Sequence, residues 1–314
     1  MDHITISQSS DSMISNNNNN PSSDDLINRS TLNSGSNYSH EFGSPVWLIY
    51  GYIVAIGTFF AFYGIENTLD VYRDPIESSL ASKQNNKSIR RRWNWRKFNN
   101  TVISLIHATL CSIGLVISLI LYPSLQNDLV FESHLIPYLV ICFSTGYFVK
   151  DFLTNLLRRH EFARNWTESS EILLHHVVCV LDMSISINKR HYTGGLMFAL
   201  LAELNNTFLH TRSLLLMGIG IPQDGPLFRA VSHLNLITNL IFRCLPNFFL
   251  AYRFVLGSPT GDPKLDSLVP KFDLSLITFS LLLLMVYQSV MFFRICTRDF
   301  KRSKAAKVSQ SKKD

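Results

Sequence analysis

The chain has 314 residues, of which 46% are hydrophobic and only 17% are charged, and its formal net charge is +6. This balance argues against an ordinary soluble domain and favours a membrane protein. The net positive charge does not indicate a nucleic-acid partner. Lys and Arg residues cluster beside apolar segments, where an anionic membrane surface is the better partner.

The first 44 residues are rich in Ser and Asn and include a run of Asn at 16–20. Such a segment has too little apolar surface to offset the entropy lost on ordering. We therefore expect residues 1–44 to form a disordered tail.

The rest of the chain is organised as apolar stretches that approach the roughly 20 residues needed to cross a bilayer as a helix. The pattern predicts an all-α integral membrane protein with about seven transmembrane helices, the last six forming a bundle around a polar cavity. The expected spans are 45–63, 102–122, 136–157, 172–187, 196–217, 234–256 and 274–296. Residues 64–99 are then a basic loop, and 299–314 a basic tail.

The distribution of Lys and Arg predicts the orientation of these spans. Basic clusters lie at 90–97, after the third span at 158–164, and at 298–307, whereas the loop after the second span has neither Lys nor Arg. Lys189 and Arg190, in the loop after the fourth span, argue weakly against this orientation. Taken together, the Lys and Arg residues place the N-terminus outside the cell and the C-terminus in the cytosol. Residues 90–97 and the C-terminal tail then lie on the anionic cytosolic leaflet. Asn28 and Asn37, each in an Asn-x-Ser sequon, would then be open to glycosylation.

Polar residues recur inside five of the seven spans, where they are costly and mark either helix contacts or a functional cavity. Those that fall at one depth, toward the cytosolic side, favour a polar cavity open to the cytosolic leaflet; interhelical hydrogen bonding is the alternative. The candidate cavity residues are His107, Lys150, Asp151, His175, His176, Asp182, Asn206, His210, His233, Asn239 and Arg243.

Within this set, His175 and His176 are the candidate catalytic residues, with Glu203 as an orienting acid. A histidine beside a carboxylate can act as a general base, a general acid or a nucleophile that carries an acyl group. Adjacent histidines are about 100° apart on a helix and are poorly placed to share one ion, so we expect no metal and no cofactor.

Several motifs within residues 90–298 resemble the TLC-domain family, which includes ceramide synthases and translocation-associated membrane proteins. The motifs are RWNWR at 92–96, STGYFVKDF at 144–152, LLHHVV at 173–178, Gly-Gly at 194–195 and LAELNNTFLHTR at 201–212. Within the family the chain looks most like the proteins that regulate plasma-membrane fluidity. The resemblance implies a TLC domain over 90–298 and a partnership with membrane phospholipids.

A departure from the ceramide synthases bears on activity. The resemblance would place their paired aspartates at Glu203 and Asn206, so the second carboxylate is missing here. The role implied by the fluidity-regulating branch is to limit the incorporation of polyunsaturated acyl chains into phospholipids such as phosphatidylethanolamine, which makes the membrane more rigid.

An enzymatic alternative stays open: an acyltransferase of ceramide-synthase type that uses acyl-CoA as co-substrate and acylates a sphingoid base or a lysophospholipid. A seven-helix receptor is a third hypothesis, disfavoured because the last span has no Asn-Pro-x-x-Tyr motif. The resemblance implies the plasma membrane as the location, while the ending Lys312-Lys313-Asp314 keeps the endoplasmic reticulum open. The sequence does not predict an oligomeric state.

Overall fold

The structure is a computed structural model that describes residues 45–83, 94–158, 166–217 and 225–310. Within these ranges the secondary structure is helical and contains no strand. The helices belong to one compact unit, Pro45–Asp314. The predicted all-α fold is therefore confirmed, whereas the predicted tail at 1–44, its two sequons and Arg90–Arg92 lie outside the described residues.

Six stretches of the described chain are long and apolar enough to cross a membrane. The first three are α2 (Pro45–Val71), α5 (Trp95–Leu121) and α6 (Leu135–Leu157). The fourth, residues Ser170–Lys189, belongs to α8 (Trp166–Lys189) despite its two histidines and Asp182. The fifth, Pro226–Val255, combines α11 (Pro226–Asn239), the π-helical turn η2 (Leu240–Cys244) and α12 (Leu245–Val255). The sixth is part of α14 (Lys271–Gln310).

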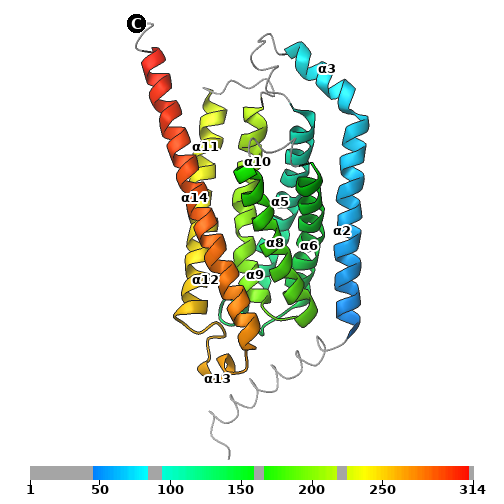
Figure 1. The fold of residues 1–314 in the computed structure, drawn as a ribbon, viewed down its shortest axis with the longest axis vertical. Coiled ribbons are helices and arrows are strands. Elements are labelled where there is room, and N and C mark those ends of the chain that lie inside the picture. The colour runs from blue at the N-terminus through cyan, green and yellow to red at the C-terminus, as the bar shows by residue number, and fades with distance from the viewer. Residues whose placement is uncertain (1–44, 84–93, 159–165, 218–224, 311–314) are drawn as a thin grey trace, which may run out of the picture. The chain divides into compact units, whose positions relative to one another are not determined.

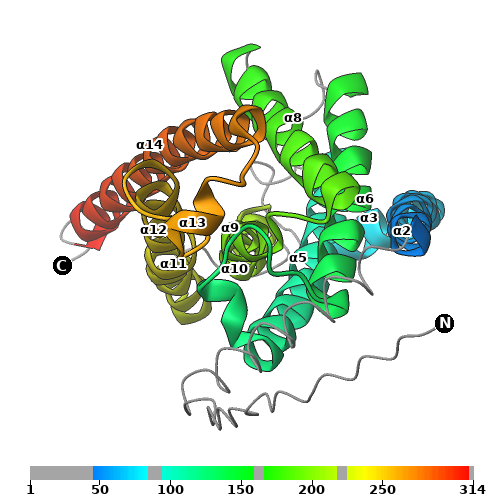
Figure 2. The same ribbon diagram turned by 90° about the horizontal axis from the view of Figure 1, so that it is seen from below.

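The remaining predicted span, 196–217, consists of two shorter helices that meet at Leu201: α9 (Thr193–Leu200) and α10 (Ala202–Leu216). Neither is long enough to cross a bilayer alone. Together they run along the bundle, and Figure 2 shows them at its centre, surrounded by the longer helices. A central helix needs no continuous apolar surface because its neighbours, not lipid, cover it.

The helix ends gather at two opposite ends of the bundle (Figure 1). One end, called the α13 end below, carries the start of α2, residues 122–134, residues 190–192 and α13 (Pro263–Asp266). The other, called the α3 end, carries α3 (Arg73–Lys83) and the C-terminus. Seven alternating passes, with α9 and α10 counted as one, account for this arrangement.

Helix α2 continues to Val71, well beyond the predicted end at residue 63. The extension holds Glu66 and Asp70, and Asp70 accepts hydrogen bonds from Trp95 Nε1 (2.6 Å) and Asn99 Nδ2 (3.0 Å) of α5. Lower on α2, a Cβ atom added at Gly146 of α6 would overlap the Ala55 carbonyl oxygen. Small residues allow helices to approach this closely in a membrane, so α2 is part of the bundle and not a detached anchor.

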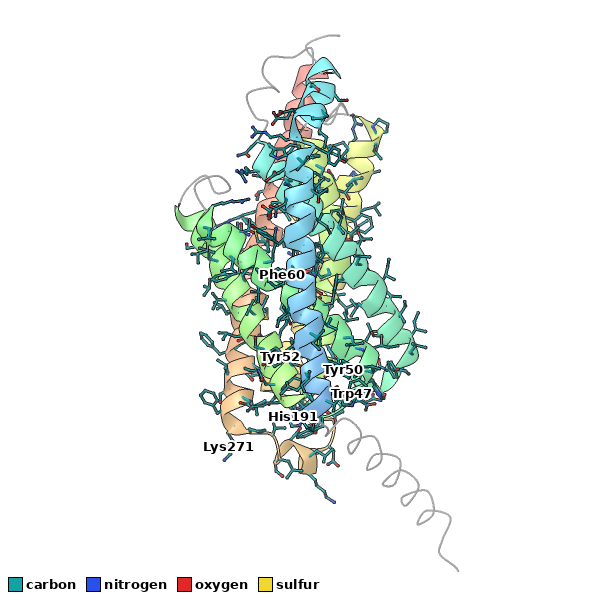
Figure 3. The ribbon with its side chains drawn as sticks, turned by 90° about the vertical axis from the view of Figure 1, so that its right-hand side faces the viewer. Trp47, Tyr50, Tyr52, Phe60, His191 and Lys271 are labelled. Atoms are coloured by element: carbon teal, nitrogen blue, oxygen red, sulfur yellow. The ribbon has the colours of Figure 1, made fainter. Side chains whose placement is uncertain are left out.

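The outer surface of the bundle is apolar along its middle and aromatic near one end. Phe60 on α2 is 62% exposed, as expected for a side chain that faces lipid. Figure 3 shows Trp47, Tyr50 and Tyr52 near the α13 end of the same helix, where His191 and Lys271 also lie. Trp and Tyr prefer the boundary between hydrocarbon and headgroups, so this end of the bundle matches the level of a membrane surface.

Candidate functional site

A cavity lies between the central pair α9 and α10 and the helices α8, α12 and α14. Apolar side chains form most of its wall, and polar side chains from α8, α10, η2, α12 and α14 gather toward mid-depth. The apolar lining residues include Leu196, Leu200, Leu250, Phe254, Ile277, Leu281 and Leu284; the polar lining residues include His175, Cys179, Asp182, Glu203, Asn206, Arg243, Asn247 and Gln288.

The cavity is large and extends toward one end of the bundle. Its volume, counted as the space open to the centre of a water-sized sphere, is about 70 Å³, several times the roughly 10–15 Å³ that one water needs by the same measure. Tyr192, Phe254 and Ile277 all belong to its lining and lie close to helix ends at the α13 end. The polar pattern of the sequence predicts an opening toward the cytosolic leaflet. On the topology predicted from Lys and Arg, however, the lining extends toward the opposite leaflet, at the α13 end.

The two adjacent histidines of α8 have different environments. His175 belongs to the cavity lining, where its ring stacks on Tyr287 at 5.2 Å and Cys179 Sγ lies 3.7 Å from its Nδ1. His176 is outside the lining and is 7% exposed; its Nε2 lies 2.7 Å from Asp151 Oδ2 and its Nδ1 2.7 Å from the Ile172 carbonyl oxygen. The turn of about 100° between consecutive residues separates the pair. One can meet a ligand, while the other holds α8 to α6.

Glu203, in the first turn of α10, is the centre of a buried polar chain. One carboxylate oxygen accepts a hydrogen bond from Asn206 Nδ2 (2.8 Å), and the other lies 3.5 Å from His107 Nδ1 of α5. His107 is fully buried and stacks on Tyr147 with ring centres 3.8 Å apart. The guanidinium of Arg243 donates to Asn206 Oδ1 at the other end of the chain. Glu203 therefore lies beside His107 and not beside His175, and its hydrogen bond comes from Asn206.

The polar residues of α11, η2 and α12 form one buried face because of the π-helical turn. Asn235, Asn239, Arg243 and Asn247 recur every fourth residue and are 0%, 0%, 8% and 4% exposed. At about 100° per residue, twelve α-helical residues would turn the last of these about 120° away from the first. The π-turn absorbs one residue, marked by the hydrogen bond from Leu245 N to the Leu240 carbonyl, and reduces this offset to about 20°.

The cause of the π-turn lies in Pro246, the second residue of α12. Proline has no N–H group to donate and its ring crowds the preceding turn, so the regular hydrogen-bond ladder cannot continue through it. The chain loosens over Leu240–Cys244, and Arg243 within that turn points into the cavity lining. Single π-turns inside helices are frequent at functional sites.

The structure divides the sequence-predicted cavity residues into three groups. His175, Asp182, Glu203, Asn206 and Arg243 belong to the lining, and Asp182 Oδ1 has no hydrogen-bond partner among the described residues. His107, Lys150, Asp151, His176 and Asn239 are buried but point to other helices. His210 is half-buried and outside the lining, and His233 is exposed on α11. For His233 the expected burial is wrong because helix depth alone says nothing about which side a residue faces.

Several residues of the cavity lining were not among those predicted from the sequence. Tyr192 lines the cavity at the α13 end with an unpartnered hydroxyl among the described residues, and its positive φ of 65° sets the turn into α9. Cys179 and Gln288 line it from α8 and α14. Cys179 is four residues after His175, so helical spacing could have identified it. Nothing local marks Gln288, whose role depends on its contact with Asn247.

These features define a class: an α-helical, multi-pass membrane protein that encloses a cavity with apolar walls and a polar, buried end. Sequence comparison then identifies the family. The profile described as the TLC domain matches residues 97–297, and the chain belongs to the TLC-domain family.

Individual relatives agree with this assignment. The chain is similar to TLC domain-containing protein 2 of Homo sapiens, at 33% identity over 62% of this chain and 67% of the relative. The protein of the same name from Mus musculus is 32% identical over 63% of this chain, and the match spans only 57% of that relative. TLC domain-containing protein 1 of Rattus norvegicus is 30% identical over 62% of this chain and 75% of the relative. Helix α2 precedes the residues matched by the family profile.

Proposed function

We propose that this protein regulates the acyl composition of membrane phospholipids, and that it limits the incorporation of polyunsaturated chains into phospholipids such as phosphatidylethanolamine. The observation that carries the proposal is the cavity, whose apolar wall suits a hydrocarbon chain and whose polar end suits a headgroup or a reacting group. Membership of the TLC-domain family supports a lipid-related role.

The polar end is the part of the cavity that must confer selectivity. A hydrocarbon chain gains little by leaving the bilayer for an apolar wall, because lipid tails are as apolar as Leu side chains. Hydrogen bonds and charge made away from water therefore have to supply the preference for one lipid over another. His175, Asn206 and Arg243 are the groups available for this recognition.

The test blocks the cavity without touching its polar groups. Ala199, a lining residue on α9, is replaced by Phe; the control is Ala61→Phe on the exposed side of α2. Cells lacking the protein receive wild type or either variant, and lipidomics and membrane-order imaging follow. We expect Ala61→Phe to restore phosphatidylethanolamine acyl composition and Ala199→Phe to leave it altered. Equal restoration by both variants, at equal protein levels, would contradict the proposal.

We assign the protein to the plasma membrane with the α3 end in the cytosol. Arg73, Arg96 and Arg158 lie at this end, and the basic residues Arg298, Lys301, Arg302, Lys304 and Lys307 belong to the last turns of α14 there, which supports this orientation by the positive-inside rule. Lys264 and Lys271, at the α13 end, oppose it. Glycosidase treatment tests the orientation: we expect it to shift the electrophoretic mobility of wild type and not of Asn28→Gln/Asn37→Gln. An epitope at the N-terminus accessible only after permeabilisation would reverse the assignment.

An acyltransferase is the second candidate function, favoured by the presence of His175, Cys179 and Glu203 in one cavity lining. A histidine 3.7 Å from a thiol has the geometry of a base beside a nucleophile. The assay incubates purified protein with acyl-CoA and either a sphingoid base or a lysophospholipid. An acylated product that His175→Ala abolishes would favour the enzyme, and no turnover with either acceptor would leave the lipid-binding regulator.

A further inference from the structure

Arg243 is a buried cation whose charge lacks a carboxylate partner. Its side chain is 8% exposed, and no carboxylate oxygen of the described residues lies within 4 Å of its guanidinium. The Nε atom of Arg243 has no hydrogen-bond partner among the described residues. The Glu203 carboxylate acts on this guanidinium electrostatically, with Asn206 between them, but makes no direct ion pair with it. Buried charges are costly and are normally paired in direct contact.

Four other cations in the membrane-spanning helices follow that rule, whereas Arg253 bonds backbone carbonyls and Arg212 donates to the Ser232 hydroxyl. Lys150 Nζ lies 2.8 Å from Glu66 Oε2, and Arg158 pairs with the other oxygen of the same carboxylate. Arg294 makes two hydrogen bonds to Glu171, and Lys189 pairs with Asp273. Arg243 is at least as buried as most of these, yet it lacks such a partner.

The protein groups beside Arg243 do not replace the missing anion. Asn206 accepts a hydrogen bond from the guanidinium, but it is a neutral amide that also donates to Glu203. The Glu203 carboxylate is shared with His107 on its far side. Arg243 therefore faces the cavity with donor capacity that the described residues leave unused.

The cavity wall indicates what kind of anion fits. From Arg243, the lining continues along α12 and α14 through Leu250, Phe254 and Leu281 to the unpartnered hydroxyl of Tyr192. A ligand with one anionic end and one long apolar chain matches this gradient. A carboxylate matches the planar fork of a single guanidinium with one negative charge. A phosphate, bulkier and more highly charged, would sit near Glu203 with only this one cation to offset it.

We propose that Arg243 binds the carboxylate of a free long-chain fatty acid whose chain lies along α12 and α14 toward Tyr192. This inference rests on the proposed lipid-regulating function and names the ligand class of its cavity. The protein would then sense or carry the free acid from which phospholipid acyl chains are made, through a site that ester-linked chains occupy less well.

The test measures binding of radiolabelled oleate to the full chain in phospholipid nanodiscs. The variants are Arg243→Gln and Arg243→Lys, and the matched control is Arg229→Gln, an exposed arginine on α11. Oleyl alcohol competes as the uncharged analogue. Because hydrogen bonds to charged groups contribute about 1.5–3 kcal/mol, we expect Arg243→Gln to weaken oleate binding roughly 10- to 100-fold.

Arg243→Lys should bind at an intermediate level, since it keeps the charge and loses the fork. If Arg243→Gln does not give a monodisperse protein, the binding measurement on Arg243→Lys tests the proposal in its place. We expect Arg229→Gln to bind like wild type and oleyl alcohol to compete poorly. Unchanged oleate affinity in a folded Arg243 variant, or equal competition by the alcohol, would overturn the proposal. If oleate does not bind while Ala199→Phe still alters cellular phospholipids, the carboxylate site fails and the proposed function stands.

Discussion

The two sides of the bundle treat buried charge differently. On the side where α2 packs against α6, the carboxylate of Glu66 neutralises Lys150 and Arg158, and Asp151 holds His176. On the cavity side, Arg243 Nε, Asp182 Oδ1 and the Tyr192 hydroxyl lack partners among the described residues. The difference between the two sides lies in counter-charge. Lys150 Nζ and Asp151 Oδ1 on the first side also make no hydrogen bond within the described residues, but Lys150 lies 2.8 Å from Glu66 and Asp151 lies 2.7 Å from His176, whereas Arg243 contacts no carboxylate there.

The contrast separates structural polar groups from functional ones. A buried charge with a complete set of protein partners holds helices together, and its removal changes stability. A buried polar group without partners at a cavity wall is satisfied by a ligand, and its removal changes binding. His175 and His176 repeat this contrast within two adjacent residues of α8.

The largest expected effect is at Glu66. Glu66→Gln leaves Lys150 buried without a carboxylate, and breaking a buried ion pair in this way costs about 3–5 kcal/mol. Denaturant titration of the purified protein measures the loss. Glu77→Gln, which removes the exposed pair with Arg73, is the control and should change stability by no more than about 1 kcal/mol. Equal losses in the two variants would show that Glu66 does not neutralise Lys150.

The charge explanation at Glu66 has its own check. Glu66→Gln combined with Lys150→Met removes both members of the pair, so the double variant should be more stable than Glu66→Gln alone. If it is less stable by the sum of both single effects, packing of the side chains and not charge is responsible.

The two histidines should separate stability from function. His176→Ala leaves the Asp151 carboxylate without its partner and should cost about 1.5–3 kcal/mol, the range for hydrogen bonds to charged groups. His175→Ala removes a ring stacked on Tyr287 and should cost about 0.5–1.5 kcal/mol. In the cellular rescue, at matched protein level, His175→Ala should be the variant that fails to restore acyl composition. Full rescue by His175→Ala would assign both residues to structure.

A substitution at Asn205 tests the buried polar contacts that join helices and do not line the cavity. Its side chain bonds the Asn235 carbonyl (2.9 Å), Thr238 (3.0 Å) and Asn239 (3.2 Å) on α11. Interhelical hydrogen bonds in membranes average about 0.6 kcal/mol each, so Asn205→Leu should lose roughly 1–2 kcal/mol without changing oleate binding. Thr211→Val is the control, because its hydroxyl bonds the Thr207 carbonyl of its own helix.

The smallest effect concerns the loop at the α13 end. The hydrogen bond from the His134 side chain, together with one from the Ser124 hydroxyl, holds the pKa of Glu132 below its ordinary value. A carboxyl with a lowered folded-state pKa adds stability above its unfolded pKa of about 4.3, and this stability disappears as the pH falls through the folded pKa. Glu132→Gln should therefore lower Tm slightly at pH 7. The Tm difference from wild type should shrink below about pH 4; a constant difference would exclude the ionised form as its cause.

Much of the fold follows from the sequence because a bilayer restricts the options to spanning helices. The span containing His175, His176 and Asp182 was predicted despite these polar residues, and α8 confirms it. The break at Leu201 was not predicted, because a central helix is covered by protein and its residues follow neither lipid nor water. Nor was the extension of α2 to Val71, since Glu66 and Asp70 look like loop residues until their partners on α5 and α6 are known.

The candidate site was harder to predict because the depth of a residue along its helix does not determine which neighbour the side chain faces. The sequence gives the depth of a residue in its helix, and His175 and His233 share a similar one; only packing reveals that the first lines a cavity and the second is exposed. The period of four in Asn235, Asn239, Arg243 and Asn247 was a usable signal. A regular helix cannot keep such a row on one face, so the pattern itself predicts the π-turn.

The π-turn lets the length of this helix vary by one residue while its two halves stay aligned. In a regular helix one residue shorter, Asn247 would follow Asn235 after eleven steps of about 100°, which leaves the same offset of about 20°. Deleting one residue from Leu240–Phe242 would therefore close the π-turn and keep Asn247, Leu250 and Phe254 toward the cavity, whereas a regular helix formed without a deletion would rotate them by about 100°. In this helix the loosened turn absorbs a one-residue difference in length, so related chains with and without that residue would enclose cavities of similar shape.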